Sequence, residues 1–226
     1  MNYLQLVNRA RTECGVSGGD LVTTSGQTGE AARFTSWINA AYVDIQTSKE
    51  DWEWMRSDVT FNLVAEQYSY TPTEAGIGST FANWKRNSFR CSSPGENYGD
   101  EQLMNYMDWS TFRDYYQYGT MRTTYSRPVV TSVKPNKDLA FGPAPDQIYV
   151  IDAEYYTKPV ELANDTDEPS LPERFHLMLV YRTMMFYGGF EAAPEVFQRG
   201  EFEFKRLMDR LTLDQLPTTV SGPPLA

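Results

Sequence analysis

The side chains best suited to metal or thiol chemistry are few in this sequence, and they are poorly spaced for it. Cys14 and Cys91 lie far apart, no CxxC pair is present, and His176 is the only histidine. Thiolates and imidazoles are the usual ligands of zinc, so this inventory argues against a metal site built on them. We therefore expect no bound metal, and we interpret both cysteines as small reduced hydrophobic residues of a cytoplasmic protein.

Carboxylates form two groups that are candidate acid–base or metal sites. Asp152 and Glu154 would share one face of a strand, a geometry that glycosidases can use, but no substrate-reading motif accompanies them. Asp165, Asp167 and Glu168 lack the spacing and the glycine of an EF-hand loop. We interpret the first group as a solvated strand face and the second as part of a linker.

A glycine-rich stretch, residues 15–29, could suggest a phosphate-binding loop. No G-K-[ST] follows it and no strand precedes it, so the mechanical requirements of a P-loop are missing. With a single histidine and no nucleophile motif, a hydrolase is also disfavoured. We therefore expect no cofactor and no enzymatic activity.

The charge balance limits the partners of the chain. Its 20 basic and 30 acidic residues give a net charge of −10, whereas gripping DNA or an anionic membrane surface requires a basic patch. The most apolar run, residues 177–187, is too short for a membrane span and is interrupted by Arg182. We expect no membrane association, and DNA could pass an acidic surface without being held.

The elements that would have to position any site are organised around residues 29–56, GEAARFTSWINAAYVDIQTSKEDWEWMR. At about 100° per residue, this stretch predicts a helix with one apolar face. Directly afterwards Val59, Phe61 and Leu63 alternate with polar residues, which predicts a strand. The members of the helical face are Phe34, Ile38, Ala41, Ile45 and Trp52.

Helices are also predicted near both ends of the chain. Residues 3–14 have apolar spacings of three and four, and residues 172–187 form a helix that is apolar on every side and ends at Gly188. Such a helix must be covered by its own domain or by neighbouring subunits. A last helix starts at Pro194 and forms a hairpin with the preceding one; its apolar stripe contains Phe197, Gly200, Phe204, Leu207 or Met208, and Leu211.

The middle of the chain is rich in strand patterns. On the clearest strand, residues 147–156, Tyr149, Ile151, Ala153 and Tyr155 share one face. Residues 107–119 predict a short helix capped by Asp108 or Ser110. The other predicted strands are residues 58–64, 66–70, 83–92, 127–133 and 139–141.

These patterns predict an α+β fold in which N- and C-terminal helices form a bundle with a β-rich insertion between them. We assign residues 1–55 and 170–212 to a discontinuous helical platform and residues 56–169 to the β-rich insertion with its short helix. Residues 213–226 contain three prolines and a glycine and should not continue a helix. They are either a frayed terminus or an extended arm that orders against a partner.

Five phrases carry a resemblance to a known family: LVNRARTECGVSG, GQTGEAARFTSWINAAYVDIQ, DWEWMR, FGPAPDQIYVIDAEYY and LPERFHLMLVYRTMMFYGG. In this order they resemble a head-to-tail adaptor, or connector, of tailed bacteriophages, over nearly the whole chain. The resemblance implies a structural virion protein at the neck, assembled in the host cytoplasm. It implies a homo-oligomeric ring, commonly twelve-fold, that binds the portal, extends the DNA channel and offers a docking surface to tail or nozzle proteins.

The resemblance also suggests which residues meet partners. The C-terminal arm would reach the portal through Pro217, Thr218, Thr219, Val220, Pro223, Pro224 and Leu225. A ring needs two different contact patches per subunit; candidates are the apolar helix 172–187 and the outer residues Ala40 and Val43. The acidic balance suits a channel, because carboxylates repel phosphates and let the duplex slide.

Another class of function stays open at this point. A virion binding module for carbohydrate or a receptor, or another tail-completion protein, would also suit the aromatic content of 14% and the β-rich middle. A sugar platform needs exposed aromatic rings on one flat face. The exposure of Trp84, Trp109 and Tyr118 discriminates between these functions.

Overall fold

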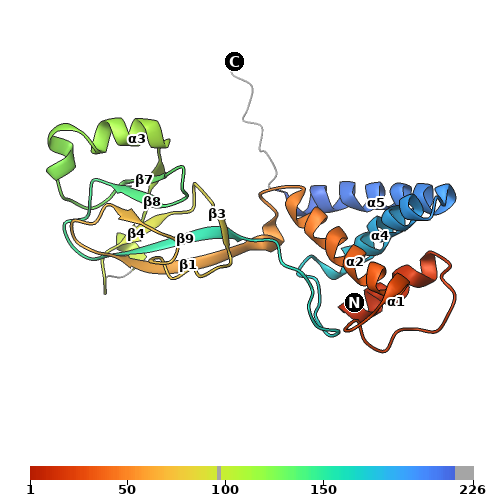
Figure 1. The fold of residues 1–226 in the computed structure, drawn as a ribbon. Coiled ribbons are helices and arrows are strands. Elements are labelled where there is room, and N and C mark those ends of the chain that lie inside the picture. The colour runs from red at the N-terminus through yellow and green to blue at the C-terminus, as the bar shows by residue number, and fades with distance from the viewer. Residues whose placement is uncertain (96–97, 217–226) are drawn as a thin grey trace, which may run out of the picture. The chain divides into compact units, whose positions relative to one another are not determined.

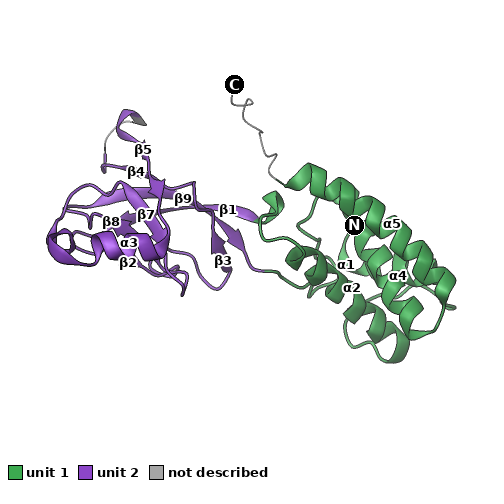
Figure 2. Ribbon diagram, turned by 90° about the horizontal axis from the view of Figure 1, so that it is seen from above, with its two compact units in different colours: residues 1–55, 159–226 green, residues 56–158 purple. Residues whose placement is uncertain are grey.

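The computed structural model describes residues 1–95 and 98–216. The chain folds into two compact units, one formed by residues 1–55 with the chain from 159 onward and the other by residues 56–158 (Figure 2). The first unit is helical and the second is β-rich, so N- and C-terminal helices flank a β-rich region. The predicted α+β class is confirmed.

The helical unit is built around α4, Leu177–Phe190, which packs against α5, α2 and α1 (Figure 1). α1 spans Tyr3–Glu13 and begins with a capping box, in which Asn2 and Gln5 each bond the other's backbone N–H. α2 spans Gly29–Thr47, and α5 spans Pro194–Gln215. α4 and α5 form the predicted hairpin.

The predicted face of the central stretch is buried. Phe34, Ile38, Ala41, Ile45 and Trp52 are all fully buried, and the Phe34 ring lies 5.6 Å from that of Tyr187 in α4. All except Ala41 share one core with side chains from the other helices, which include Leu6, Val7, Met178, Leu179, Met184, Leu207 and Leu211.

The apolar stripe predicted on α5 is correct except at its start. Leu207 and Leu211 are buried, and Phe204 is partly buried against the same core. Phe197, which we also assigned to this core, is 36% exposed and lies outside it. The reason is its place in the first turn of α5, where the helix packs on Gly188 near the end of α4.

The central helix is shorter than the apolar pattern predicted. α2 ends at Thr47, and a short 3₁₀ helix, η1 at Glu53–Met55, follows. Trp52 reaches the core because the chain folds back, and its indole Nε1 donates to the Ile45 carbonyl at 3.0 Å. The same carbonyl also accepts from the N–H of Ser48 at 3.3 Å and from its hydroxyl at 2.7 Å, so Trp52 and Ser48 together satisfy a carbonyl of the last turn of α2.

The second boundary between the units lies at residue 158, not at 169 as predicted. The first-turn N–H groups of Tyr3 and Leu4 donate to the Asp167 and Asp165 carbonyls, at 2.8 and 3.2 Å. Leu162 in the same segment is buried in the helical core. Residues 159–171 therefore belong to the helical unit, because they satisfy N–H groups that α1 cannot satisfy itself.

The β-rich unit contains two sheets. In the first, β9 is central: it pairs with β1 along eight residues of continuous register, and with β4 and β3 on its other side. The strands of this sheet are β1 (Arg56–Leu63), β9 (Tyr149–Thr157), β4 (Arg90–Ser92), β5 (Gln102–Leu103) and β3 (Phe81–Trp84). The strands of the second, in spatial order, are β2 (Ser69–Tyr70), β8 (Leu139–Gly142), β7 (Val130–Val133) and β6 (Asn105–Tyr106).

The predicted faces of β9 agree with the structure. Tyr149, Ile151 and Ala153 are buried in the core of the β-rich unit, and Tyr155 packs partly buried against it. The short helix α3, Trp109–Tyr116, begins as predicted, with the Asp108 carboxylate accepting from two backbone N–H groups. α3 and the second sheet share a small core formed by Phe112, Tyr116, Val130 and Ala140.

Three further predicted boundaries are wrong. Residues 83–92 form two strands, because a turn at Lys85 and Ser88 lets β3 and β4 pair with different parts of β9. α4 runs through Gly188 and Gly189 to Phe190, since neither glycine has the positive φ of a helix stop. α5 continues to Gln215, so its last three residues, assigned to the arm, are helical.

Candidate assembly surfaces

His176, the only histidine of the sequence, contacts the N-terminal segment at the start of α4. His176 is buried at the start of α4; the Met1 amino group lies 2.9 Å from its Nδ1, and its Nε2 lies 3.0 Å from the Leu171 carbonyl oxygen. Burial lowers the pKa of the imidazole. A neutral ring with the proton on Nε2 satisfies both partners, so His176 helps to hold the N-terminal segment against α4.

Both cysteines are buried and have a raised thiol pKa, which makes them unreactive. Both are buried; burial raises the pKa of the Cys14 thiol to about 12, and it also raises that of Cys91. Thiolate chemistry is suppressed in such surroundings. Within residues 1–95 and 98–216, no group of three or more histidine, cysteine, aspartate or glutamate side chains could hold a metal ion.

The carboxylates singled out on β9 are held by neighbouring strands. The Thr60 hydroxyl of β1 donates to Asp152. Glu154 forms an ion pair with Lys85 and a second with Arg56, in which Nε and Oε2 are 3.7 Å apart. These contacts link β9 to β1 and to the end of β3 on the polar face of the first sheet.

The carboxylates of the segment after β9 hold loops. Asp165 accepts from the backbone N–H and the hydroxyl of Thr24, both at 2.6 Å. Asp167 accepts from the N–H groups of Ala163 and Asn164 at 2.8 Å. These hydrogen bonds lower the pKa of both carboxyls, and the Asp165 pair ties the loop at residues 15–28 to residues 159–171.

The aromatic residues named for a sugar platform do not form one. Trp84 is buried, and its Nε1 donates to the Lys137 carbonyl at 2.9 Å. Trp109 is partly buried and stacks on Phe112, while Tyr118 is 60% exposed. Because only one of the three rings is freely exposed, the carbohydrate-binding alternative loses its main support.

The apolar helix 172–187 is not an outward contact patch. α4, which begins at Leu177, is covered by α1, α2 and α5 of its own unit, and Met178, Leu179, Val180 and Met184 are fully buried. The other helices of the same chain therefore cover this helix. The prediction that residues 172–187 form a contact patch between subunits is wrong.

A hollow lies on the outer side of α2, where Ala40 and Val43 were named. It has a volume of about 640 Å³. Ala40 is exposed and Val43 half-buried, and Asp44 at the rim is 2.8 Å from the Arg182 Nε. The full lining is Tyr3, Thr35, Ser36, Asn39, Ala40, Val43, Asp44, Thr47 and Glu161.

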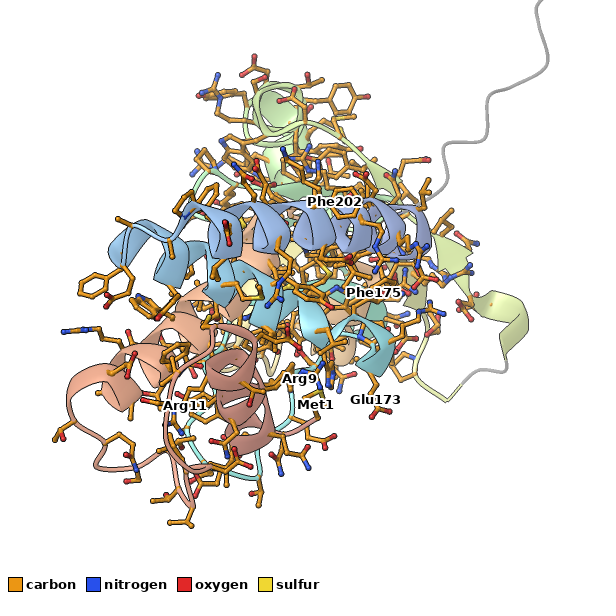
Figure 3. All side chains as sticks on the ribbon, turned by 90° about the vertical axis from the view of Figure 1, so that its right-hand side faces the viewer. Met1, Arg9, Arg11, Glu173, Phe175 and Phe202 are labelled. Atoms are coloured by element: carbon orange, nitrogen blue, oxygen red, sulfur yellow. The ribbon has the colours of Figure 1, made fainter. Side chains whose placement is uncertain are left out.

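The outer face of α5 was not singled out from the sequence. It exposes Phe202 at 68% and Leu213 at 86%, and Lys205, Arg206 and Asp209 between them are also exposed. In Figure 3, Phe202 lies on α5 on the side of the helical unit away from α1. The spacing of eleven residues between Phe202 and Leu213 is the signal that could have identified this face, because it returns to the same side of a helix.

A third exposed group lies where α4 ends. Phe190 is 55% exposed, the Arg33 guanidinium carbon lies 4.3 Å from its ring centroid, and the Trp37 ring lies 5.8 Å away. The residues predicted for the portal-binding arm, Pro217 to Leu225, lie outside the described residues.

Comparison with known proteins identifies the family. None of the described helices is both long and apolar enough to span a membrane. No curated protein matches the chain significantly. The family described as SU10 adaptor protein matches residues 1–223. The chain therefore belongs to the SU10 adaptor protein family, and it is a phage adaptor, a structural component of the virion.

Proposed function

We propose that this adaptor assembles as a ring beneath the portal, extends the DNA channel and presents a docking surface to tail or nozzle proteins. The observation that carries the proposal is the division of a whole-chain adaptor into two separately packed units. Each unit has its own buried core, so each can present a binding surface without help from the other. One unit can then serve the head side of the junction and the other the tail side.

The two strands at which the chain enters and leaves the β-rich unit pair with each other. The chain enters the β-rich unit at β1 and leaves it through β9, and these two strands pair from Arg56 opposite Tyr156 to Leu63 opposite Tyr149. A two-stranded ladder with continuous register resists separation of the two crossings. The first and last strands of the β-rich unit are thereby held side by side.

The arm from Pro217 to Leu225 is the segment we propose for portal contact. The segment contains three prolines, and proline-rich segments are recurrent ligands of protein grooves. It follows α5, which ends at Gln215.

The net charge of −10 supports passive passage of DNA through the ring. Carboxylates lining a channel repel phosphates, and the duplex then slides without sequence-specific binding. The assembled state would be a ring, twelve-fold by the resemblance, at the neck of the virion, and assembly would take place in the host cytoplasm. Basic residues along the lumen of the assembled ring would contradict the passive-passage proposal.

The test is to mix the purified chain with the portal of its phage and image the product by electron microscopy. We expect a ring on the tail-facing end of the portal, and the absence of any complex would refute the proposal. A variant that ends at Leu216 should bind the portal more weakly if the arm takes part. The control is Val22→Ser, at a position 89% exposed in the helical unit, which should bind like the unmodified chain.

A further inference from the structure

We infer that neighbouring copies of this chain contact each other through the outer face of α5 on one copy and the α2 hollow on the next. The inference rests on the proposed ring and names its subunit interface. The outer face of α5 means Phe202, Lys205, Arg206, Asp209 and Leu213; the α2 hollow is the cavity lined by Ala40, Val43, Asp44, Glu161 and their neighbours.

The two surfaces lie on opposite sides of the helical unit. α4 is the middle layer, with α5 packed on one side and α1 and α2 on the other (Figures 1 and 3). Phe202 points away from α4 on the first side. Ala40 and Val43 lie on the side of α2 opposite its buried Phe34 and Ile38, and so face away from α4 on the second. A head-to-tail ring requires two different patches placed in this way.

The outer face of α5 has the composition of a protein–protein contact surface. At about 100° per residue, Phe202 and Leu213 differ by only about 20° around the helix, and they lie about 16 Å apart along it. Both are large, apolar and more than two thirds exposed. Solvent-facing helix positions are ordinarily polar. Phenylalanine and arginine, here Phe202 and Arg206, are both residue types enriched at protein–protein interfaces.

The α2 hollow combines an apolar contact surface with carboxylates at its rim. The hollow is open to solvent and mostly polar, and Ala40 and Val43 provide the apolar part of its lining, against which an aromatic ring can pack. Asp44 and Glu161 place carboxylates at its rim. Among the described residues Glu161 forms no ion pair, so its charge is open to a partner.

Charge complementarity favours a second copy as the occupant. Lys205 and Arg206 lie one turn after Phe202, whereas the hollow carries Asp44 and Glu161. Asp44 pairs with Arg182 of its own chain, so Glu161 is the carboxylate without a salt bridge among the described residues. Lys205 and Arg206 pair with Glu201 and Glu203 of their own helix, but such exposed pairs contribute little and can be exchanged for a partner's carboxylates. Asp209 is the one acidic residue of the face. Pairing the α5 face with itself would bring like cations together and leave the hollow empty.

Disulfide trapping tests the interface. The native cysteines will not interfere, since Cys14 is 6% exposed and Cys91 is fully buried. The full chain with Phe202→Cys and Ala40→Cys is assembled on the portal under mild oxidation and run on a non-reducing gel. We expect a ladder of covalent multimers from the double variant, dimers from a mixture of the two single variants, and monomers from either single variant alone. Val22→Cys, at a loop position that is 89% exposed, should give monomers.

The outcomes separate this inference from the proposed function. If rings form on the portal but the double variant gives no ladder, the interface is wrong and the ring stands. Covalent dimers from Phe202→Cys alone would show that α5 faces itself and would also overturn it. If the unmodified chain forms no ring, the proposed function fails first.

A second variant tests the hollow without a disulfide. Ala40→Arg fills the hollow at an exposed helix position that the fold does not need, so circular dichroism should be unchanged. Subunit association should weaken about tenfold or more, as for the loss of a hot spot. Normal ring formation by Ala40→Arg would overturn the inference.

Discussion

Gly200 of α5 lies directly against the backbone of Tyr181 in α4. A Cβ atom at position 200 would be 2.8 Å from the Tyr181 carbonyl oxygen and 3.0 Å from the Met184 Cβ. Real Cβ atoms do not approach a backbone oxygen so closely, so the absence of a side chain at Gly200 sets the separation of the two helices. This contact holds α5 in place, and with it the outer face that carries Phe202.

The first prediction follows from that contact. Gly200→Ala should destabilise the protein by about 1–3 kcal/mol, because the added methyl group must push the α4 backbone away. Gly189→Ala is the matched control: it is also a helix glycine, but nothing lies within 4 Å of its Cβ position. It should stabilise by up to about 1 kcal/mol through helix propensity. Denaturant unfolding measures both, and equal effects of the two substitutions would refute the packing argument.

The fold-back of Trp52 gives a second prediction. Trp52→Phe removes the indole donor to the Ile45 carbonyl and leaves a void in the core, which should cost about 1–3 kcal/mol. Trp54→Phe is the control, because the buried Nε1 of Trp54 has no hydrogen-bond partner among the described residues. Trp54→Phe should change the free energy of unfolding little in the same experiment. A larger loss for Trp54→Phe than for Trp52→Phe would contradict this explanation.

The third prediction concerns pH. The folded-state pKa of His176 lies below its ordinary value of 6.5, mainly because the ring is buried; the Met1 amino group lowers it further, and Glu173 and Glu168 oppose the shift. The unfolded state therefore binds the proton more readily. The stability contributed by neutral His176 is complete above pH 6.5 and is lost as the pH falls below it. Unfolding midpoints at pH 7.5 and 5 should differ less in His176→Gln than in the unmodified chain.

A fourth prediction concerns the link between residues 15–28 and the segment after β9. Asp165→Ala removes the acceptor for Thr24, so this loop should be cleaved faster by a non-specific protease. Asp20→Ala, an exposed change in the same loop, is the control and should leave cleavage unchanged. The pKa of Asp165 is lowered by its bonds to Thr24, so the protection should disappear in the unmodified chain as the pH falls below its ordinary value of 3.8. Equal cleavage of both variants would contradict the role of Asp165.

Local periodicity was sufficient for features in which one side of an element is buried. The 3.6-residue repeat through Phe34, Ile38 and Ile45 and the two-residue repeat through Tyr149 and Ile151 both match the buried faces. The α+β class could be predicted for the same reason. A buried face leaves its period in the sequence wherever a regular element carries it.

The places where the chain departs from those periods depend on long-range packing. The 3.6-residue repeat placed Trp52 on the central helix, but the residue reaches the same core by folding back to the Ile45 carbonyl. It likewise placed Phe197 in the core, although this residue is 36% exposed where the first turn of α5 packs on Gly188. Residues 159–171 look like a linker until the N–H groups of Tyr3 and Leu4 are seen to need their carbonyls.

The same distinction applies to the assembly surfaces. The apolar pattern of residues 172–187 predicts that this helix must be covered, but not that α1, α2 and α5 of the same chain cover it. The sequence by itself pointed to Ala40 and Val43 of the α2 hollow, but not to the outer face of α5 or to the placement of the two surfaces on opposite sides of one helical unit. The physical reason is that periodicity reports only whether a side is buried, whereas the covering segment is chosen by packing between residues far apart in the chain.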